Sequence, residues 1–88
     1  MTEEAELSRF LDAEGRLRTM PARPRVQAAA LRYLLGKFDP ERSYTEREVN
    51  GLLLDWHLFG DPARLRRDMF EAGLPTRDRA GREYRVVR

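Results

Sequence analysis

Two groups of arginines near the end of the chain have the residue type and the spacing needed to bind nucleic acid. Arg64 and Arg67 lie three residues apart, so they are neighbours on one face if the segment is helical. The second group, Arg77, Arg79 and Arg82, surrounds a turn that contains a glycine. A guanidinium group can clamp phosphates or bind guanine through two parallel hydrogen bonds. These arginines are therefore the candidate nucleic-acid-binding residues.

Both groups also have a purely structural interpretation. Asp68 and Glu71 follow Arg64 and Arg67 at i, i+4 spacing. Opposite charges at that spacing stabilise a helix by about 0.2–0.5 kcal/mol per pair, and the acids would repel phosphate. The arginines around the turn can equally form a solvated hairpin end. The sequence leaves both interpretations open.

The positive charge of the chain is concentrated in its last third. Residues 1–61 carry nine basic and eleven acidic side chains, whereas residues 62–88 carry eight arginines and four acids. The net charge of the whole chain is only +2. Sixteen of the seventeen basic residues are arginine. GC-rich coding DNA would account for that ratio but not for the clustering, which suits a phosphate-binding surface.

Composition excludes several kinds of chemistry. The chain has no cysteine and one histidine, which excludes disulfides, thiolate-ligated metals and a His-rich zinc centre. No glycine-rich phosphate loop is present, and Ser8 and Ser43 have no base to pair with except His57, for which we expect a capping role at a helix end. We therefore expect neither an enzyme nor a bound cofactor. The acidic start and the lack of a long apolar run predict a cytoplasmic protein without a membrane segment.

Hydrophobic spacing and turn residues predict the elements that position the arginines. Apolar stripes predict the helices, and extended runs around residues 78–81 predict the hairpin. We expect helices over residues 3–11, 24–38, 45–56 and 61–72, an extended arm at 17–20, a minimal strand at 42–44, and hairpin strands at 74–77 and 82–87. The helix from Pro24 to Phe38 has the widest apolar surface, so it should be the hub of the core.

Local signals mark where the later helices begin. Thr45 with Glu48 has the spacing of a capping box, and Asp61-Pro62 supplies a cap followed by a proline in the first turn. Asn50-Gly51 is a hairpin signal, but the apolar residues around it have helical spacing, so we expect a helix. A glycine inside a helix costs about 1 kcal/mol relative to alanine. We expect close approach of another backbone to explain Gly51.

Four aromatic residues could stack on bases, but core packing is the favoured interpretation. They are Tyr44, Trp56, Phe59 and Phe70. Trp56 and Phe70 fall on or beside the apolar stripes of their helices, which favours burial. Arg66 lies nearer the buried edge of its helix than Arg64 and Arg67, and we expect it to hold the hairpin in place.

The predicted order is helix, short strand, helix, turn, helix, hairpin, which is the order of a winged helix. We therefore expect a mainly α fold with a small β-hairpin, a winged helix-turn-helix over residues 24–88 preceded by a helix and arm in residues 1–23, in one compact domain overall. In such proteins the second helix of the pair enters the major groove of DNA. Here that recognition helix is residues 61–72, and the hairpin over residues 74–87 is the wing.

The sequence also resembles a bacterial family catalogued as domain of unknown function 2087. The resemblance rests on the run from Tyr44 to Asn50, on Asp61, Leu65-Arg66-Arg67-Asp68-Met69, Gly73, Arg77, Gly81 and Tyr84, and upstream on Phe10-Leu11-Asp12, Gly15-Arg16-Leu17 and Met20-Pro21-Ala22. It would cover about residues 10–87. It implies a winged-helix-like domain, in some members joined to a regulator, and no catalytic residue.

Two functions follow as alternatives. The first is a transcriptional regulator, or an accessory domain of one, that binds double-stranded DNA through Arg64, Arg67, Arg79 and Arg82. The second is a protein-interaction or dimerisation module. Its possible contacts are Leu7, Phe10 and Leu11, an apolar stripe that could pack on a second copy of the chain or on a regulator protein.

Overall fold

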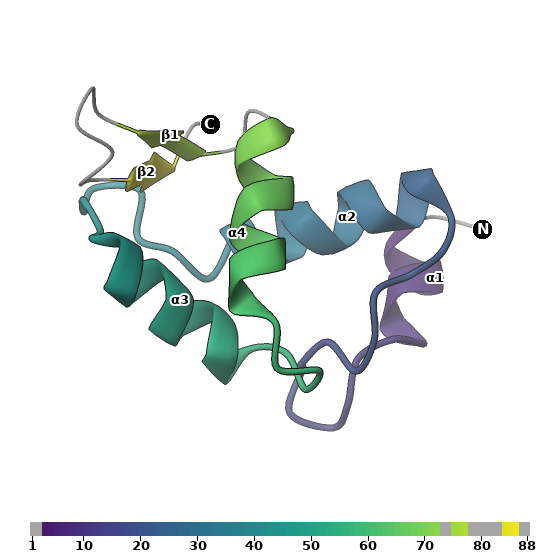
Figure 1. Cartoon of the computed structure of the whole chain (residues 1–88). Helices are drawn as coiled ribbons and strands as arrows, with labels where there is room; N and C mark the ends of the chain where they lie inside the picture. The colour runs from purple at the N-terminus through teal and green to yellow at the C-terminus, as the bar shows by residue number, and fades with distance from the viewer. Residues whose placement is uncertain (1–2, 73–74, 78–83, 87–88) are drawn as a thin grey trace.

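The computed structural model describes residues 3–72, 75–77 and 84–86 of the 88-residue chain. In this part the chain forms four helices and a two-stranded antiparallel sheet (Figure 1). The elements are α1 (Glu3–Ser8), α2 (Pro24–Leu35), α3 (Glu46–Asp55), α4 (Pro62–Glu71), β1 (Pro75–Arg77) and β2 (Tyr84–Val86). The expected fold class, mainly α with a small β-hairpin, is confirmed. No helix among the described residues is long and apolar enough to cross a membrane.

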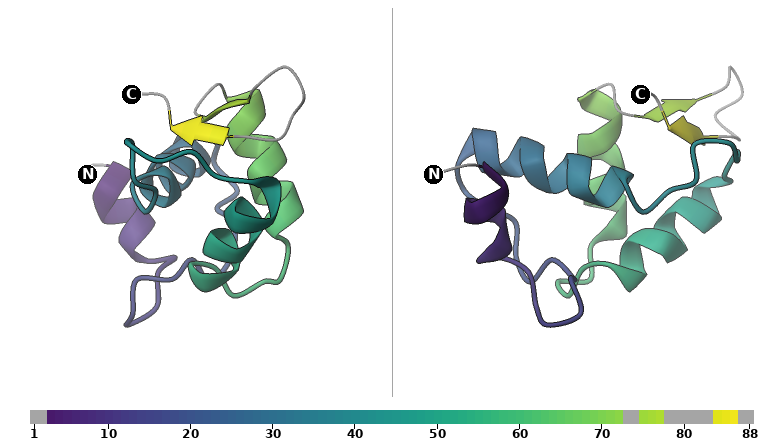
Figure 2. Two further views of the ribbon diagram at one scale, coloured as in Figure 1. Left: turned by 90° about the vertical axis from the view of Figure 1, so that its left-hand side faces the viewer. Right: turned by 180° about the vertical axis from the view of Figure 1, so that it is seen from behind.

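Helix α2 is the centre of the core, as its wide apolar surface predicts. Its buried residues are Val26, Ala29, Ala30, Leu31, Leu34 and Leu35. Helix α1 packs beside its N-terminal part and α4 crosses nearer its other end (Figure 2). The helix ends at Leu35, before the predicted end at Phe38, because the N–H of Phe38 bonds only three residues back, to the carbonyl of Leu35. Phe38 nevertheless stays buried.

The first helix is shorter than predicted, because the chain turns early. Helix α1 ends at Ser8 and not at Leu11. After it, Asp12 Oδ1 accepts hydrogen bonds from the backbone N–H groups of Glu14 at 3.0 Å and Arg16 at 2.7 Å. An aspartate that bonds to the backbone ahead of it stabilises a turn in place of a helix. The turn brings the chain back so that Leu17 bridges Leu11.

The extended segment predicted at residues 17–20 is bound to the rest of the molecule through Leu17. The N–H of Leu17 donates to the carbonyl of Trp56 at 2.8 Å, and its carbonyl accepts the N–H of Leu58 at 2.9 Å. Its side chain is fully buried. Leu17 thereby supplies backbone partners to the turn that follows α3.

Helix α3 begins at the predicted capping box. The Glu48 N–H donates to Thr45 Oγ1 at 3.1 Å, and the Thr45 N–H donates to Glu48 Oε1 at 3.0 Å. The Thr45 N–H and the nearby Arg42 hold the pKa of Glu48 below its ordinary value. The hairpin signal at Asn50-Gly51 is overridden, and Val49 and Leu53 face the core as helical spacing requires.

The reason expected for Gly51 is wrong. A Cβ added at Gly51 would meet nothing within 4 Å, and the residue is exposed. Its backbone is not approached by another segment of the described part of the chain. By contrast, Gly15 has a φ of +81°, and a Cβ there would lie 2.7 Å from the Tyr33 hydroxyl oxygen. At Gly15 the close neighbour is thus a side chain, and not the backbone that we expected at Gly51.

His57 fixes the turn between α3 and α4. Only 3% of its surface is exposed. Its Nδ1 bonds to the carbonyl of Leu53 in the last turn of α3, and its Nε2 accepts the N–H of Asp61 at 2.9 Å. This pattern requires the neutral ring with its proton on Nδ1. The capping role expected for His57 agrees with these bonds, which join the end of α3 to the cap of α4.

Helix α4 begins at the predicted residue, but fewer of its residues are buried than the sequence predicts. Asp61 Oδ1 accepts the N–H of Arg64 at 3.2 Å, and Pro62 lies in the first turn. Leu65 and Met69 are buried in the core. Ala72, expected on the same inner stripe, follows the end of the helix and is exposed.

The hairpin is confirmed, and a third extended residue joins it. Pro75 pairs with Val86 and Arg77 with Tyr84, in antiparallel register. On the other side of β2, Tyr44 and Tyr84 exchange two backbone hydrogen bonds of 2.9 and 2.7 Å. The minimal strand predicted at residues 42–44 is thus a single bridge at Tyr44. It places the start of α3 beside the hairpin.

Substitution of Gly51 by alanine should stabilise the protein. Position 51 lies on the exposed face of α3 with free space around it, so the gain is about 1 kcal/mol in the free energy of unfolding, or roughly 4–8 °C in Tm. Thermal unfolding followed by circular dichroism measures it. The matched control is Gly15→Ala, which should lower Tm because of its positive φ and the nearby Tyr33 hydroxyl. An unchanged or lower Tm for Gly51→Ala would contradict the helical environment described here.

Substitution of His57 by leucine should destabilise the protein by about 1–3 kcal/mol, the cost of leaving the Asp61 N–H without its acceptor. Urea unfolding provides the measurement. His57→Gln is the matched control, since its amide oxygen can reach the same N–H, and it should lose less. Equal losses in both variants would show that the ring fills space and that its hydrogen bond to Asp61 contributes nothing.

Candidate nucleic-acid interface

An open groove of about 480 Å³ runs along the exposed side of α4. One side is the start of α3 and the other is β2. Its lining residues are Glu46, Asp61, Ala63, Arg64, Arg66, Arg67, Phe70 and Tyr84. The two arginines that the sequence singled out on this helix, Arg64 and Arg67, therefore share one surface. Three arginines and two acids line the groove, so its charge is mixed with an excess of positive charge.

Arg64 forms the ion pair that its spacing predicts. Its Nε lies 3.7 Å from Oδ2 of Asp68, and half of its side chain is exposed. At this exposure and distance the pair contributes at most a few tenths of a kcal/mol. Arg64 is therefore held loosely, and its guanidinium can leave Asp68 for an anion at small cost.

Arg66 joins α4 to α3. It donates to Oδ1 of Asn50, and its Nη2 lies 3.4 Å from Oε1 of Glu46. Only 21% of its side chain is exposed. We expected Arg66 to hold the hairpin, and the bonds described in the structure lead to α3 instead. The reason is the tight packing of α3 against α4, which puts polar groups of α3 within reach first.

Arg67 differs from its neighbours on the helix. It is exposed, and its side chain makes no ion pair or hydrogen bond with any residue that the structure describes. The pair expected with Glu71 at i, i+4 is not formed. Among the described residues, nothing binds the guanidinium of Arg67, and its donors face the groove.

Of the three arginines predicted around the hairpin turn, the structure describes only the backbone of Arg77. The backbone of Arg77 lies in β1 opposite Tyr84, and its side chain is outside the described part. Arg79 and Arg82 lie outside the described residues altogether. Strand β1 lies beside the C-terminal end of α4 and pairs with β2 (Figure 1).

Phe70 is the groove residue that the sequence analysis missed. We expected it in the core with Trp56, but 39% of its surface is exposed and it lines the groove. The helical stripe gives the reason. Leu65 and Met69 are four residues apart and point inward, and Phe70 follows Met69 by one residue, or about 100° around the helix. Tyr44, by contrast, is buried, and Trp56 and Phe59 pack against the core.

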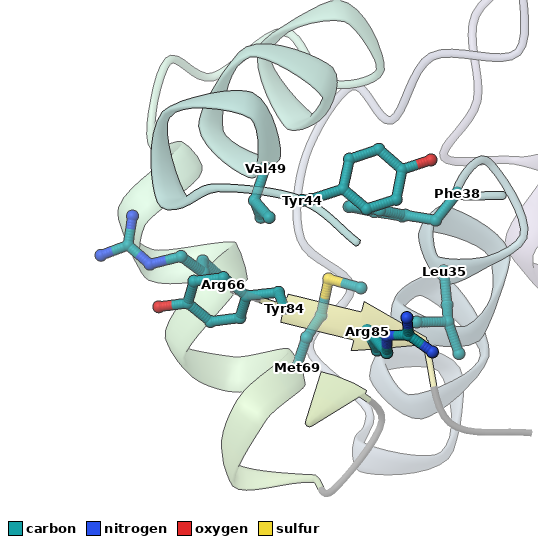
Figure 3. Close-up of a pocket in the computed structure, with 8 residues that line it drawn as sticks. All are labelled: Leu35, Phe38, Tyr44, Val49, Arg66, Met69, Tyr84 and Arg85. Carbon is teal, nitrogen blue, oxygen red and sulfur yellow. The ribbon is translucent and has the colours of Figure 1, made fainter. Parts of the chain in front are cut away.

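A second space lies beneath the hairpin, and it is too small for a ligand. Its volume is about 10 Å³, room for about one water molecule. Its lining residues, drawn in Figure 3, are Leu35, Phe38, Tyr44, Val49, Arg66, Met69, Tyr84 and Arg85. The Met69 side chain extends into this space from α4 (Figure 3). It is a gap in the core packing and no binding site.

The predicted dimer contacts lie on this chain's own core. Leu7 is 5% exposed, and Phe10 and Leu11 are partly buried against the core. Because α1 packs on α2, Leu7 is covered within the chain itself and is not available to a second copy. The dimer contacts at these residues therefore lose the observation that motivated them.

Potential metal ligands are not gathered in the described part of the chain. No group of three or more His, Asp or Glu side chains could hold an ion there. The one histidine uses both ring nitrogens within the α3–α4 turn. The groove along α4 is the candidate functional site because it brings Arg64 and Arg67 together on one surface.

Comparison with known proteins identifies a family and nothing more. A family model described as an uncharacterized protein conserved in bacteria, DUF2087, matches residues 16–86. The resemblance predicted from residues 10–87 is confirmed over most of its length. No curated protein and no solved structure matches the chain. Because the match spans most of the 88 residues, the protein belongs to the DUF2087 family of proteins conserved in bacteria.

Proposed function

We propose that this protein binds double-stranded DNA as a winged helix, with α4 in the major groove and the β1–β2 hairpin as the wing, and that it acts in transcription regulation. The observation that carries the proposal is the exposed groove along α4, where Arg64 and Arg67 lie together. Helix N-termini and arginines on the second helix of such a pair commonly contact bases and phosphates.

The chain topology supports the winged-helix assignment. The elements follow the order helix, extended residue, helix, turn, helix, hairpin, and Tyr44 pairs with β2 on the side opposite β1. This pairing anchors the hairpin beside the start of α3. A protein that lays α4 in a groove of DNA would thereby bring the hairpin toward the neighbouring backbone.

The charge distribution supports a modest affinity. Residues 62–88 carry a net charge of +4, while residues 1–61 carry −2. Asp61, Asp68 and Glu71 lie on or beside the proposed reading helix and oppose phosphate. We therefore place non-specific binding at a Kd of about 10⁻⁴–10⁻⁶ M, and we expect it to weaken steeply with salt. The proposed function is binding without catalysis.

The proposal is tested by fluorescence anisotropy on a labelled duplex of arbitrary sequence at 50 and 200 mM salt. On a duplex of arbitrary sequence both arginines can meet phosphate, so replacing Arg64 and Arg67 together by alanine should make the slope of log Kd against log salt smaller by nearly two. The matched control replaces Arg9 and Arg25, two exposed arginines outside the groove, by alanine. It should bind like the wild type. An absence of wild-type binding at the lower salt would overturn the proposal.

A second candidate function, self-association, is favoured by a different observation. Leu54, in the last turn of α3, and Leu58, in the turn that follows, are 51% and 48% exposed. Large apolar side chains that remain exposed close together in the chain are typical of interaction surfaces. This surface replaces the stripe of Leu7, Phe10 and Leu11 as the candidate for contact with a second copy.

Sedimentation velocity over a range of concentrations tests this second candidate. If the copies associate through this surface, the wild type should dimerise and a Leu54→Glu/Leu58→Glu variant should remain monomeric, because two carboxylates would be buried in the interface. Asp55→Ala, beside the surface, is the control and should dimerise. A wild type that is monomeric at all concentrations would exclude the second candidate.

A further inference from the structure

The three arginines of α4 differ in the ion pairs and hydrogen bonds that their side chains make. Arg64 is paired with Asp68 at 3.7 Å, and Arg66 is bound to Glu46 and Asn50 of α3. Arg67 has no ion pair or side-chain hydrogen bond within the described residues. Bidentate binding of guanine needs two parallel N–H groups of one guanidinium. Arg67 is the α4 arginine that can offer them without first giving up a partner.

Phe70 lies on the same face as Arg67. Ala63, Arg67 and Phe70 follow i, i+4, i+7 spacing, which places them on one face of α4, and all three line the groove. A phenyl ring has no attraction for phosphate. In the major groove, however, apolar side chains contact the C5-methyl group of thymine. The exposed ring of Phe70 can therefore contact the thymine methyl group, to which an arginine cannot form a hydrogen bond.

The spacing of these residues matches the spacing of bases. Helical rise is about 1.5 Å per residue, so Arg67 and Phe70 are separated by about 4.5 Å along α4, and Ala63 and Phe70 by about 10 Å. Base pairs are stacked about 3.4 Å apart. A helix that lies along the groove would bring Arg67 and Phe70 to base pairs one or two steps apart.

We propose that Arg67 and Phe70 determine the base preference of this protein: Arg67 binds a guanine, and Phe70 contacts the methyl group of a thymine one or two base pairs away. The inference rests on the proposed function and adds the sequence class that the groove recognises. Arg64, loosely paired with Asp68, contacts phosphate and positions α4 without reading sequence.

Selection of bound duplexes from a random library tests the proposal. The wild type should enrich duplexes with a guanine within two base pairs of a thymine. Arg67→Ala should lose its preference for guanine by about 5- to 150-fold, the range expected for one bidentate contact. Arg64→Ala is the matched control, because it should weaken binding to selected and unrelated duplexes alike.

The thymine contact is tested on the DNA, which leaves the protein unaltered. Replacing the selected thymine by deoxyuridine removes only the C5-methyl group, and it should weaken wild-type binding. Phe70→Ala should bind the thymine and deoxyuridine duplexes equally. Circular dichroism of Arg67→Ala and Phe70→Ala checks that both variants fold, which we expect because both positions are exposed.

The outcomes separate this inference from the proposed function. A wild type that binds no duplex at low salt would overturn both. Binding with no enriched sequence, or with a guanine preference that survives Arg67→Ala, would overturn the inference and leave the DNA-binding proposal intact. Equal binding of the wild type to thymine and deoxyuridine duplexes would also overturn it.

Discussion

Leu53 of α3 and Leu65 of α4 are both completely buried in the core that these two helices share with α2. Their burial determines which way each face of α4 points. Because Leu65 and Met69 must face inward, residues 63, 64, 67 and 70 must face outward. His57 then fixes the turn between the two helices from inside. The proposed reading surface is therefore a consequence of apolar packing on the opposite side of the same helix.

Some arginines of α4 bind other parts of the protein, and others can bind a ligand. Arg66 is committed to α3 through Asn50 and Glu46, and removing it would loosen the contact between the helices that presents the groove. Arg67 makes no such bond to any residue in the described part of the chain. A small domain has a thin core, so long side chains that connect its elements contribute a larger share of its stability. The arginine count alone therefore overstates the positive charge that can meet a ligand.

The features that the sequence predicted correctly are local ones. The Thr45–Glu48 capping box, the Asp61 cap and the strands of the hairpin depend on residues close together in the chain, so their types and spacing sufficed. The features predicted wrongly depend on segments far apart. The surroundings of Gly51, the burial of Leu7 against α2 and the partners of Arg66 follow from tertiary packing, which periodicity does not encode. Phe70 could have been assigned to the surface from its angle to Leu65 and Met69.

If α4 binds DNA as proposed, the acids beside its arginines lower non-specific affinity and thereby favour specificity. Non-specific binding to DNA grows with every phosphate that a cation neutralises, and it carries no sequence information. In the proposed complex Asp68, which pairs with Arg64, and Asp61, at the start of the helix, would reduce that component. A guanine contact by an arginine without a partner is affected less, because it depends on hydrogen-bond geometry as well as charge. A DNA-binding helix of mixed charge therefore has a lower general affinity for DNA but a higher ratio of specific to non-specific binding. That ratio decides occupancy where many non-specific sites compete.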